Sequence, residues 1–272
     1  MGAEWPLRRE DFLAYYKFAP AALAIRECVR LAAVRDLDLP DPILDVGCGD
    51  GLFARLAYPN RQAWGIDINP GEVRRAQSTQ SYRTIICGNI CDVDLPRAFF
   101  ESAIANCSLE HVPDIGAALR NVRGALVPGA PFVLIVPTPD WTRQLLTSRA
   151  LECVGLSALA RMYGEALDRV FYHRHLYDER GWGVLLDEAG FQLVEHRPLV
   201  GPSTSWAFDA MLYPSALGLA VKKLTGRWVV APALRPLTAE IVRRAAQAVA
   251  AGADDELDER AGEIVLIARA RE

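Results

Sequence analysis

The chain has 272 residues, of which 51% are hydrophobic and 24% are charged. This balance is typical of a folded protein with a substantial core, and it excludes disorder and fibrous structure. The 30 Lys and Arg residues against 34 Asp and Glu residues give a net charge of −4. The chain therefore lacks the basic field that nucleic-acid binding usually requires, and we expect no nucleic-acid partner.

The six cysteines form no CxxC pair and have no histidine beside them at zinc-site spacing. We therefore expect no metal site and reduced thiols. The N-terminus has no apolar signal-peptide core, and no apolar run reaches the roughly 18 residues of a membrane-spanning helix. These features predict a cytoplasmic protein.

The first part of the chain predicts helices followed by a strand and a glycine-rich turn. Residues 11–37 have the apolar spacing of leading helices, broken at Pro20. An apolar run at 43–46 then enters the turn, and helical spacing resumes at 52–57.

The same alternation continues along the chain, which implies a parallel sheet covered by helices on both faces. Six further strands are expected within 63–70, 84–90, 102–112, 131–139, 191–199 and 262–272. We predict a Rossmann-like, doubly wound α/β fold with a seven-stranded, mostly parallel sheet and helical insertions.

We expect one domain across 1–272, built on this sheet. Its parts are an N-terminal helical cap at 1–40, a core at 41–139, a helical insertion at 140–177, the C-terminal part of the sheet at 178–200 and 260–272, and a second insertion at 201–259.

The turn after the first strand carries the strongest chemical signal. Asp45 closes the strand, and glycines follow at alternate positions, where they allow a ligand to approach the backbone closely. A dinucleotide fingerprint starting at Gly47 would need glycine at 52, and the chain has Leu52. The charge of Asp45 would repel a pyrophosphate and suit a cationic group.

Two later strand ends add to this pattern. Asp67 ends the second strand, where doubly wound folds place an acidic residue on ribose hydroxyls. At the end of the third strand, Asn89 can bond an adenine edge and Ile90 can pack on its face. A positive centre, a ribose and an adenine together describe S-adenosylmethionine (SAM).

Several ordered motifs resemble the class I SAM-dependent methyltransferases, most closely the branch called methyltransferase type 11, which includes the ubiquinone and menaquinone C-methyltransferases. The motifs are D-V-G-C-G-D-G, I-D-I, G-N-I, N-C-S-L-E-H-V and L-V-P-G-A-P-F-V-L-I-V-P, between about Pro42 and Pro137. The resemblance implies SAM as cofactor, with S-adenosylhomocysteine (SAH) as product. It also implies methyl transfer to an O, C or N nucleophile of a small-molecule acceptor such as a quinone, a lipid-like compound, a sugar or a secondary metabolite.

The resemblance also implies roles for individual residues. It puts Asp67 on the ribose, Ile68, Asn89 and Ile90 at the adenine, and Asn106 near the methionine end. Around the methionine moiety it puts Asp45, Gly47, Cys48, Gly49 and Gly51. Tyr16 lies on a leading helix that folds over the cofactor in related enzymes, although aromatic packing on the core would explain this residue equally.

Three histidines are candidates for a catalytic base. His111 follows the fourth strand, at the edge where open α/β sheets bind ligands, and its alternative role is only to shape the loop. His173 and His175 lie in a polar, aromatic segment that fits an acceptor pocket or a solvated surface.

The second insertion has three interpretations. From Trp206 to Val221 only Asp209 is charged, and basic residues and Trp228 follow. An interfacial helix at 206–228 on a membrane, a hydrophobic lid and a homodimer interface all fit these residues.

Two other functions stay open at this stage. One is a SAM-binding protein of this fold without methyl transfer, since a fold does not fix an activity. The other is a nicotinamide-dependent oxidoreductase.

Overall fold

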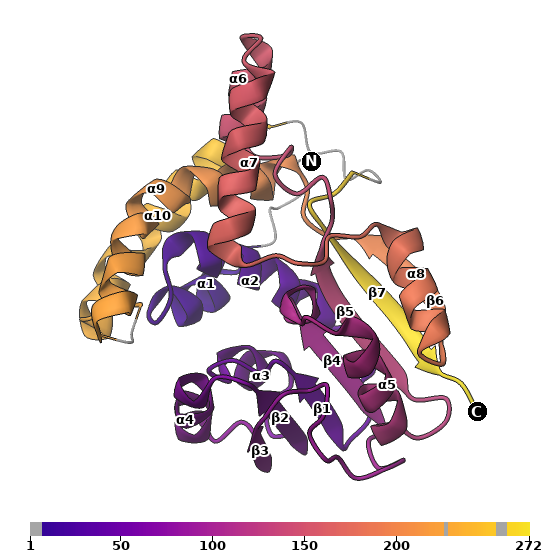
Figure 1. Cartoon of the computed structure of the whole chain (residues 1–272). Helices are drawn as coiled ribbons and strands as arrows, with labels where there is room; N and C mark the ends of the chain where they lie inside the picture. Colours follow the sequence, from indigo (N-terminus) through magenta and orange to yellow (C-terminus); the bar gives the residue numbers. More distant parts are fainter. Residues whose placement is uncertain (1–6, 226–227, 254–259) are drawn as a thin grey trace. The chain divides into compact units, whose positions relative to one another are not determined.

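The structure is a computed structural model that describes residues 7–225, 228–253 and 260–272 (Figure 1). The chain folds into two compact units. The sheet unit comprises 33–139, 171–197 and 263–272, and the helical unit comprises 1–32, 140–170 and 198–262. Each unit is therefore assembled from segments that are far apart in the sequence.

The sheet unit contains a seven-stranded sheet in the order β3-β2-β1-β4-β5-β7-β6. Its strands are β1 (Ile43–Val46), β2 (Ala63–Asp67), β3 (Thr84–Cys87), β4 (Ser102–Asn106), β5 (Pro131–Pro137), β6 (Phe191–Pro198) and β7 (Glu263–Ala270). The pairs among β1 to β5 are parallel, whereas β7 runs antiparallel to β5. This confirms the predicted Rossmann-like, mostly parallel sheet.

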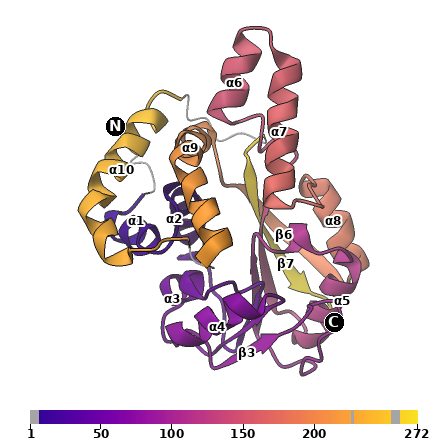
Figure 2. The same cartoon turned by 60° about the vertical axis from the view of Figure 1, so that its left-hand side comes forward.

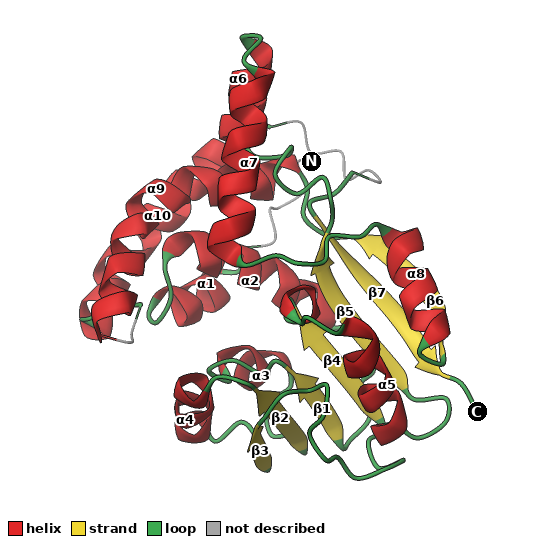
Figure 3. Cartoon of the chain, in the orientation of Figure 1, coloured by secondary structure: helices red, strands yellow, loops and turns green. Residues whose placement is uncertain are grey.

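The helices of the sheet unit begin at recognisable caps. They are α3 (Leu52–Ala57), α4 (Pro70–Thr79), the short 3-10 helix η1 (Leu109–His111), α5 (Ile115–Ala125) and α8 (Glu179–Glu188). The side chains of Asn69, Asp114 and Asp178 accept backbone N–H bonds at the starts of α4, α5 and α8. Helices α5 and α8 lie side by side against the sheet (Figure 3), and Leu119 and Trp182 are fully buried in its core.

The strand order brings the predicted ligand-binding residues to one edge of the sheet. The order reverses between β1 and β4, and such a switch point is where open α/β sheets bind ligands. Since β1, β2, β3 and β4 are parallel, the residues that follow them meet at this edge.

The helical unit consists of α1 (Arg9–Tyr16), α2 (Ala21–Val34), α6 (Leu146–Cys153), α7 (Ser157–Phe171), α9 (Pro202–Thr225), η2 (Pro232–Leu234) and α10 (Arg235–Ala250). Within it, α9 and α10 lie side by side (Figure 2). The buried Arg26 guanidinium lies over the rings of Trp141 and Phe208, 5.1 and 4.0 Å from their centroids. No helix among the described residues is long and apolar enough to cross a membrane.

Three details differ from the sequence-based prediction. The third strand ends at Cys87 rather than Ile90. The helical insertion ends at Phe171, because Tyr172 adopts a left-handed backbone conformation with φ 57° and the chain runs without helix up to Asp178. Helix α9 continues through Pro214, although a proline inside a helix removes one N–H donor and usually interrupts the helical pattern.

Candidate functional site

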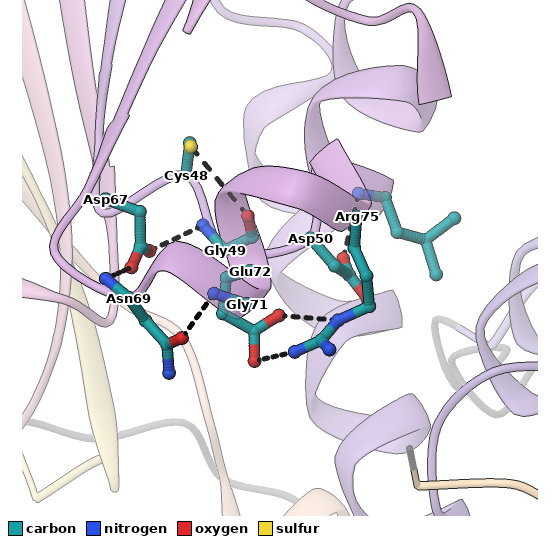
Figure 4. A network of polar contacts seen from close by, with 9 residues as sticks. Cys48, Gly49, Asp50, Asp67, Asn69, Gly71, Glu72 and Arg75 are labelled. Atoms are coloured by element: carbon teal, nitrogen blue, oxygen red, sulfur yellow. Dashed lines mark hydrogen bonds and ion pairs between the residues drawn. The ribbon is translucent and has the colours of Figure 1, made fainter. Parts of the chain in front are cut away.

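Asp67 organises the glycine loop that follows β1. Its Oδ2 accepts a hydrogen bond from Gly49 N at 2.9 Å, and its Oδ1 accepts one from Asn69 N at 2.8 Å (Figure 4). The loop is also tied to β2 through Gly47 N and Cys48 N, which both donate to the Ile66 carbonyl. One carboxylate thus connects the ends of two neighbouring strands.

The glycines of this loop are required for different reasons. Gly47, with φ 76°, lies so close to Ser108 that a Cβ would come within 2.2 Å of the serine Cβ. Ser108 Oγ in turn donates to the Val46 carbonyl at 2.5 Å. Gly49 also has positive φ, but a Cβ there would meet nothing within 4 Å. Open space therefore faces the centre of the loop at Gly49.

Asp45 lies under the loop with 3% of its surface exposed. Two tyrosine hydroxyls donate to the same carboxylate oxygen, Oδ2: Tyr58 at 2.5 Å and Tyr82 at 2.6 Å. Tyr82 also reaches the Cys48 carbonyl at 3.5 Å. The phenols therefore connect the acid at the end of β1 to the loop backbone.

Burial sets the protonation of this cluster. It raises the pKa of Asp45 to about 6, against the two phenol hydrogen bonds, which lower it. Burial likewise raises the pKa of Asp67 and that of the Cys48 thiol. Cys48 therefore stays protonated at neutral pH, as expected of a small loop residue rather than a nucleophile.

The other predicted cofactor residues lie at the neighbouring strand ends. The Ile68 side chain, directly after β2, is 70% exposed, whereas Ile90 is buried. Asn89 follows β3, and its Oδ1 accepts from Cys91 N at 3.1 Å. Asn106 is the last residue of β4. All four belong to the sheet unit together with the glycine loop.

Tyr16 belongs to the helical unit. Its ring stacks on Phe12 with centroids 5.3 Å apart, and the Arg235 guanidinium lies 3.8 Å from its centroid. Its hydroxyl is 3.2 Å from Thr238 Oγ1. These contacts match the packing alternative for Tyr16, and its contact with a cofactor stays a prediction.

The three candidate histidines come together in the sheet unit. The rings of His111 and His173 stack with centroids 5.6 Å apart, and Phe171 stacks on His173 at 5.9 Å. The segment after α7 is held beside η1 because Arg174 N and His175 N both donate to the Glu110 carbonyl. Histidines far apart in the sequence therefore share one cluster.

Hydrogen bonds distinguish two of these histidines. A carbonyl oxygen can only accept, so the contact of His111 Nδ1 with the Tyr172 carbonyl at 3.2 Å assigns the proton of the neutral ring to Nδ1. In that tautomer Nε2 is the acceptor nitrogen, and it lies 3.7 Å from Glu110 Oε1, with which it pairs when the ring is protonated. In His175, Nε2 donates to the Val112 carbonyl at 2.8 Å and Nδ1 faces the Tyr177 hydroxyl at 3.3 Å. His111 Nε2 therefore faces the Glu110 carboxylate, whereas the two ring nitrogens of His175 contact a backbone carbonyl and a phenol.

Sequence reasoning missed several residues of this site. Tyr58 and Tyr82 lie in no motif, and only the packing brings them to the loop. Ser108 lies in the motif N-C-S-L-E-H-V, but its contact with the loop was not visible there. Glu110 was visible beside His111, but its burial was not. Among the described residues, no group of His, Cys, Asp or Glu could hold a metal ion.

Comparison with solved structures gives the fold a clear set of neighbours. A SAM-dependent methyltransferase from Mesorhizobium loti matches with a TM-score of 0.51 and 18% identity, covering 90% of this chain and 97% of that one. Phosphoethanolamine N-methyltransferase 2 of Haemonchus contortus, solved with SAM, matches with a TM-score of 0.54 and 14% identity, covering 97% of this chain and 58% of that one.

Curated relatives match over a shorter stretch. An uncharacterized methyltransferase of Mycobacterium tuberculosis is 35% identical over 96 residues, which are 34% of this chain and 49% of the relative. The 27-O-demethylrifamycin SV methyltransferase of Amycolatopsis mediterranei is 32% identical over 123 residues, 40% of this chain and 45% of the relative. The chain spans about half the length of these relatives.

A family model described as a methyltransferase domain matches residues 15–196. This match includes the glycine loop, Asp67 and all three candidate histidines, and it confirms the resemblance that the motifs indicated. The chain therefore belongs to the class I SAM-dependent methyltransferases.

Proposed function

We propose that the protein transfers the methyl group of SAM to a small-molecule acceptor, with the glycine loop and Asp67 holding the cofactor and His111 acting as the base. The observation that carries the proposal is that the glycine loop and His111 lie at the same edge of the sheet. The loop contacts Ser108 through Gly47, and His111 follows Ser108 by one turn of η1.

The residues at this edge fit the chemistry of SAM. The loop and the end of β2 supply the carboxylates Asp45, Asp50 and Asp67 and no basic side chain, which suits hydroxyl groups and a cation and would repel phosphates. The exposed side chain of Ile68 offers an aliphatic surface for a purine. The open space at Gly49 lets a ligand approach the backbone.

The remaining predicted contacts complete this proposal. Asn89 and Ile90 would meet the adenine, and Asn106 would support the backbone near the methionine end. Cys48 and Gly51 would shape the loop around the methionine moiety. Tyr16 is the last residue that the resemblance implies for the cofactor.

When bound, SAM supplies a methyl group already activated by its sulfonium. The protein's contribution is then to hold the acceptor in line and to accept a proton when the nucleophile is a hydroxyl or an acidic carbon. His111 Nε2 would accept this proton, with Nδ1 held by the Tyr172 carbonyl and the Glu110 carboxylate placed to pair with the protonated ring. His173 stacks on the His111 ring and orients it, whereas His175 positions the segment by bonding the Val112 carbonyl.

The cofactor part is tested by isothermal titration of the full chain with SAH, with NADH as the control ligand. We expect SAH to bind and NADH not to bind, and Asp67→Ala to weaken SAH binding strongly. A thermal shift at high SAH concentration gives an independent check, because a ligand that binds only the folded state stabilises it. A folded protein without SAH binding would refute the proposal.

The base is tested by SAH release across a panel of phenols, hydroquinones, amines and acidic carbon compounds. With any acceptor that turns over, His111→Gln should lower kcat by roughly a hundredfold or more with SAH affinity unchanged. His196→Gln is the matched control, because His196 lies on β6 and pairs with Glu179 at 3.1 Å. Equal turnover in the two variants would remove His111 from the mechanism.

A further inference from the structure

Helix α10 carries its large aliphatic side chains on its outer face. Its buried residues are small alanines, Ala239, Ala246 and Ala250. On the opposite side, Leu234 at the helix start, Leu237 and Ile241 are 62%, 75% and 70% exposed. Their spacing of three and four residues aligns these three side chains, the α10 stripe, along one face. Clustered exposed aliphatic side chains indicate a surface that meets a partner.

The chain just before α10 extends this apolar surface. Leu224 at the end of α9 is 87% exposed, and Val230 in the connection is 68% exposed. In the same stretch, Lys222 Nζ lies 4.3 Å from the centroid of the Trp228 ring. Aliphatic, aromatic and basic side chains thus occur together at this end of the α9–α10 pair.

Charge distinguishes this segment from the rest of the protein. Residues 222–244 contain six basic residues and one acidic residue, a net charge of +5, in a chain whose net charge is −4. The acidic residue, Glu240, is itself paired with Arg243 and Arg244 at 2.9 and 2.8 Å. The Arg244 side chain is 76% exposed and lies one turn beyond Ile241.

We infer that the α10 stripe and its basic neighbours dock the protein on an anionic lipid surface. Aliphatic side chains on one face of a helix, flanked by Lys, Arg and Trp, suit the boundary between headgroups and acyl chains. A symmetric contact with a second copy would bring two segments of charge +5 together, which is electrostatically unfavourable. This inference is independent of methyl transfer.

This surface lies only partly within the segment expected from the sequence. The segment 206–228 was a candidate for an interfacial helix, but Ala207, Phe208 and Asp209 are at most 1% exposed. The first turns of α9 belong to the core of the helical unit because Phe208 packs against Arg26. The exposed aliphatic side chains Leu224, Val230, Leu234, Leu237 and Ile241 lie at the end of this segment and beyond it.

The test is co-sedimentation of the full chain with vesicles of phosphatidylcholine alone or with about 30% phosphatidylglycerol. We expect the wild type to pellet with the anionic vesicles only, and high salt to weaken the binding. Leu237→Ser/Ile241→Ser should lower the partition coefficient by roughly tenfold or more, because both side chains lose their apolar contact. Lys222→Gln/Arg244→Gln should reduce binding to anionic vesicles as well.

A matched control is available in the same unit. Leu159 and Met162 on α7 are 47% and 62% exposed, but the α6–α7 segment 146–171 contains three basic and three acidic residues. Leu159→Ser/Met162→Ser removes a comparable apolar surface from a neutral segment. This variant should pellet like the wild type.

Several results would overturn the inference. They are no pelleting of the wild type with anionic vesicles, an equal loss in the two serine variants, a dimer in solution that Leu237→Ser/Ile241→Ser dissociates, and binding to polyglutamate without binding to vesicles. A lower Tm of the Leu237→Ser/Ile241→Ser variant without lipid would also contradict it, because an exposed stripe contributes little to stability.

Discussion

Asp45 in the sheet unit and Asp209 in the helical unit are both almost fully buried, and both accept hydrogen bonds from tyrosine hydroxyls. Asp45 receives two phenols on one oxygen, Oδ2. Asp209 receives the Tyr163 hydroxyl on Oδ1 and the backbone N–H of Thr147 on Oδ2 at 2.7 Å.

The difference lies in what each carboxylate stabilises. Thr147 is in the first turn of α6, so Asp209 on α9 caps another helix at its positive end. Asp45 instead has Asp67 nearby, and burial raises its pKa. Asp209 therefore has a structural role, whereas Asp45 is held in its charged form at a cost, which is typical of a functional site.

Asp209→Ala should have the largest effect. It removes the acceptor of a buried N–H and a buried hydroxyl and leaves a cavity, so the free energy of unfolding should fall by about 3 kcal/mol. Hydrogen exchange should show the loss first at the start of α6. A variant as stable as the wild type, with α6 fully protected, would contradict the structural role of Asp209.

The matched pair Asp45→Asn and Asp209→Asn should change stability in opposite directions at neutral pH. An Asn at 45 removes an unfavourable buried charge, so the free energy of unfolding should rise, by up to about 3 kcal/mol. An Asn at 209 weakens two hydrogen bonds and should cost about 1 kcal/mol. Urea denaturation at neutral pH measures both. If both variants lose stability, Asp45 is structural like Asp209.

The pH dependence of stability tests the same contrast. The pKa of Asp45 in the folded protein is about 6, above its ordinary value of 3.8. The folded state therefore binds this proton more tightly, so the contribution of Asp45 to stability is greatest below pH 3.8 and is lost as the pH rises through 6. The stability gap between Asp45→Asn and the wild type should widen by about 3 kcal/mol across this window. A gap that is constant with pH would refute the raised pKa.

The sequence identified Asp45 as a candidate site residue more clearly than it identified Asp209. Asp45 was recognisable because it ends an apolar run before alternating glycines, and parallel strands must bring such ends to one edge. The hydrogen-bond partners of Asp45 were not recognisable, because Tyr58 and Tyr82 lie 13 and 37 residues away without any periodic spacing. Asp209 was visible only as a lone charge in an apolar segment, and its partner Tyr163 is 46 residues away.

For the histidine cluster, too, the sequence identified the residues but not their contacts. Residue type and position after a strand identified His111 as a candidate, and the aromatic segment identified His173. Their stacking depends on the left-handed turn at Tyr172 and on the bonds of the following backbone to the Glu110 carbonyl. Local patterns predict elements and strand ends, whereas contacts between distant side chains follow from packing that no short pattern encodes.

Removal of single tyrosine hydroxyls should have the smallest effect on stability, and it distinguishes the Asp45 and Asp209 sites most sharply. Tyr58→Phe, Tyr82→Phe and Tyr163→Phe each remove one hydroxyl and keep the ring, so each should cost about 1 kcal/mol of stability. Only the first two remove a hydrogen bond that lowers the pKa of Asp45. If Asp45 attracts the cationic cofactor, they should shift the pH midpoint of SAM binding upward, whereas Tyr163→Phe should leave it in place. Titration calorimetry between pH 5 and 8 measures this midpoint, over a range that brackets the Asp45 pKa of about 6. An equal shift in all three variants, or in none, would mean that the charge of Asp45 does not reach the cofactor.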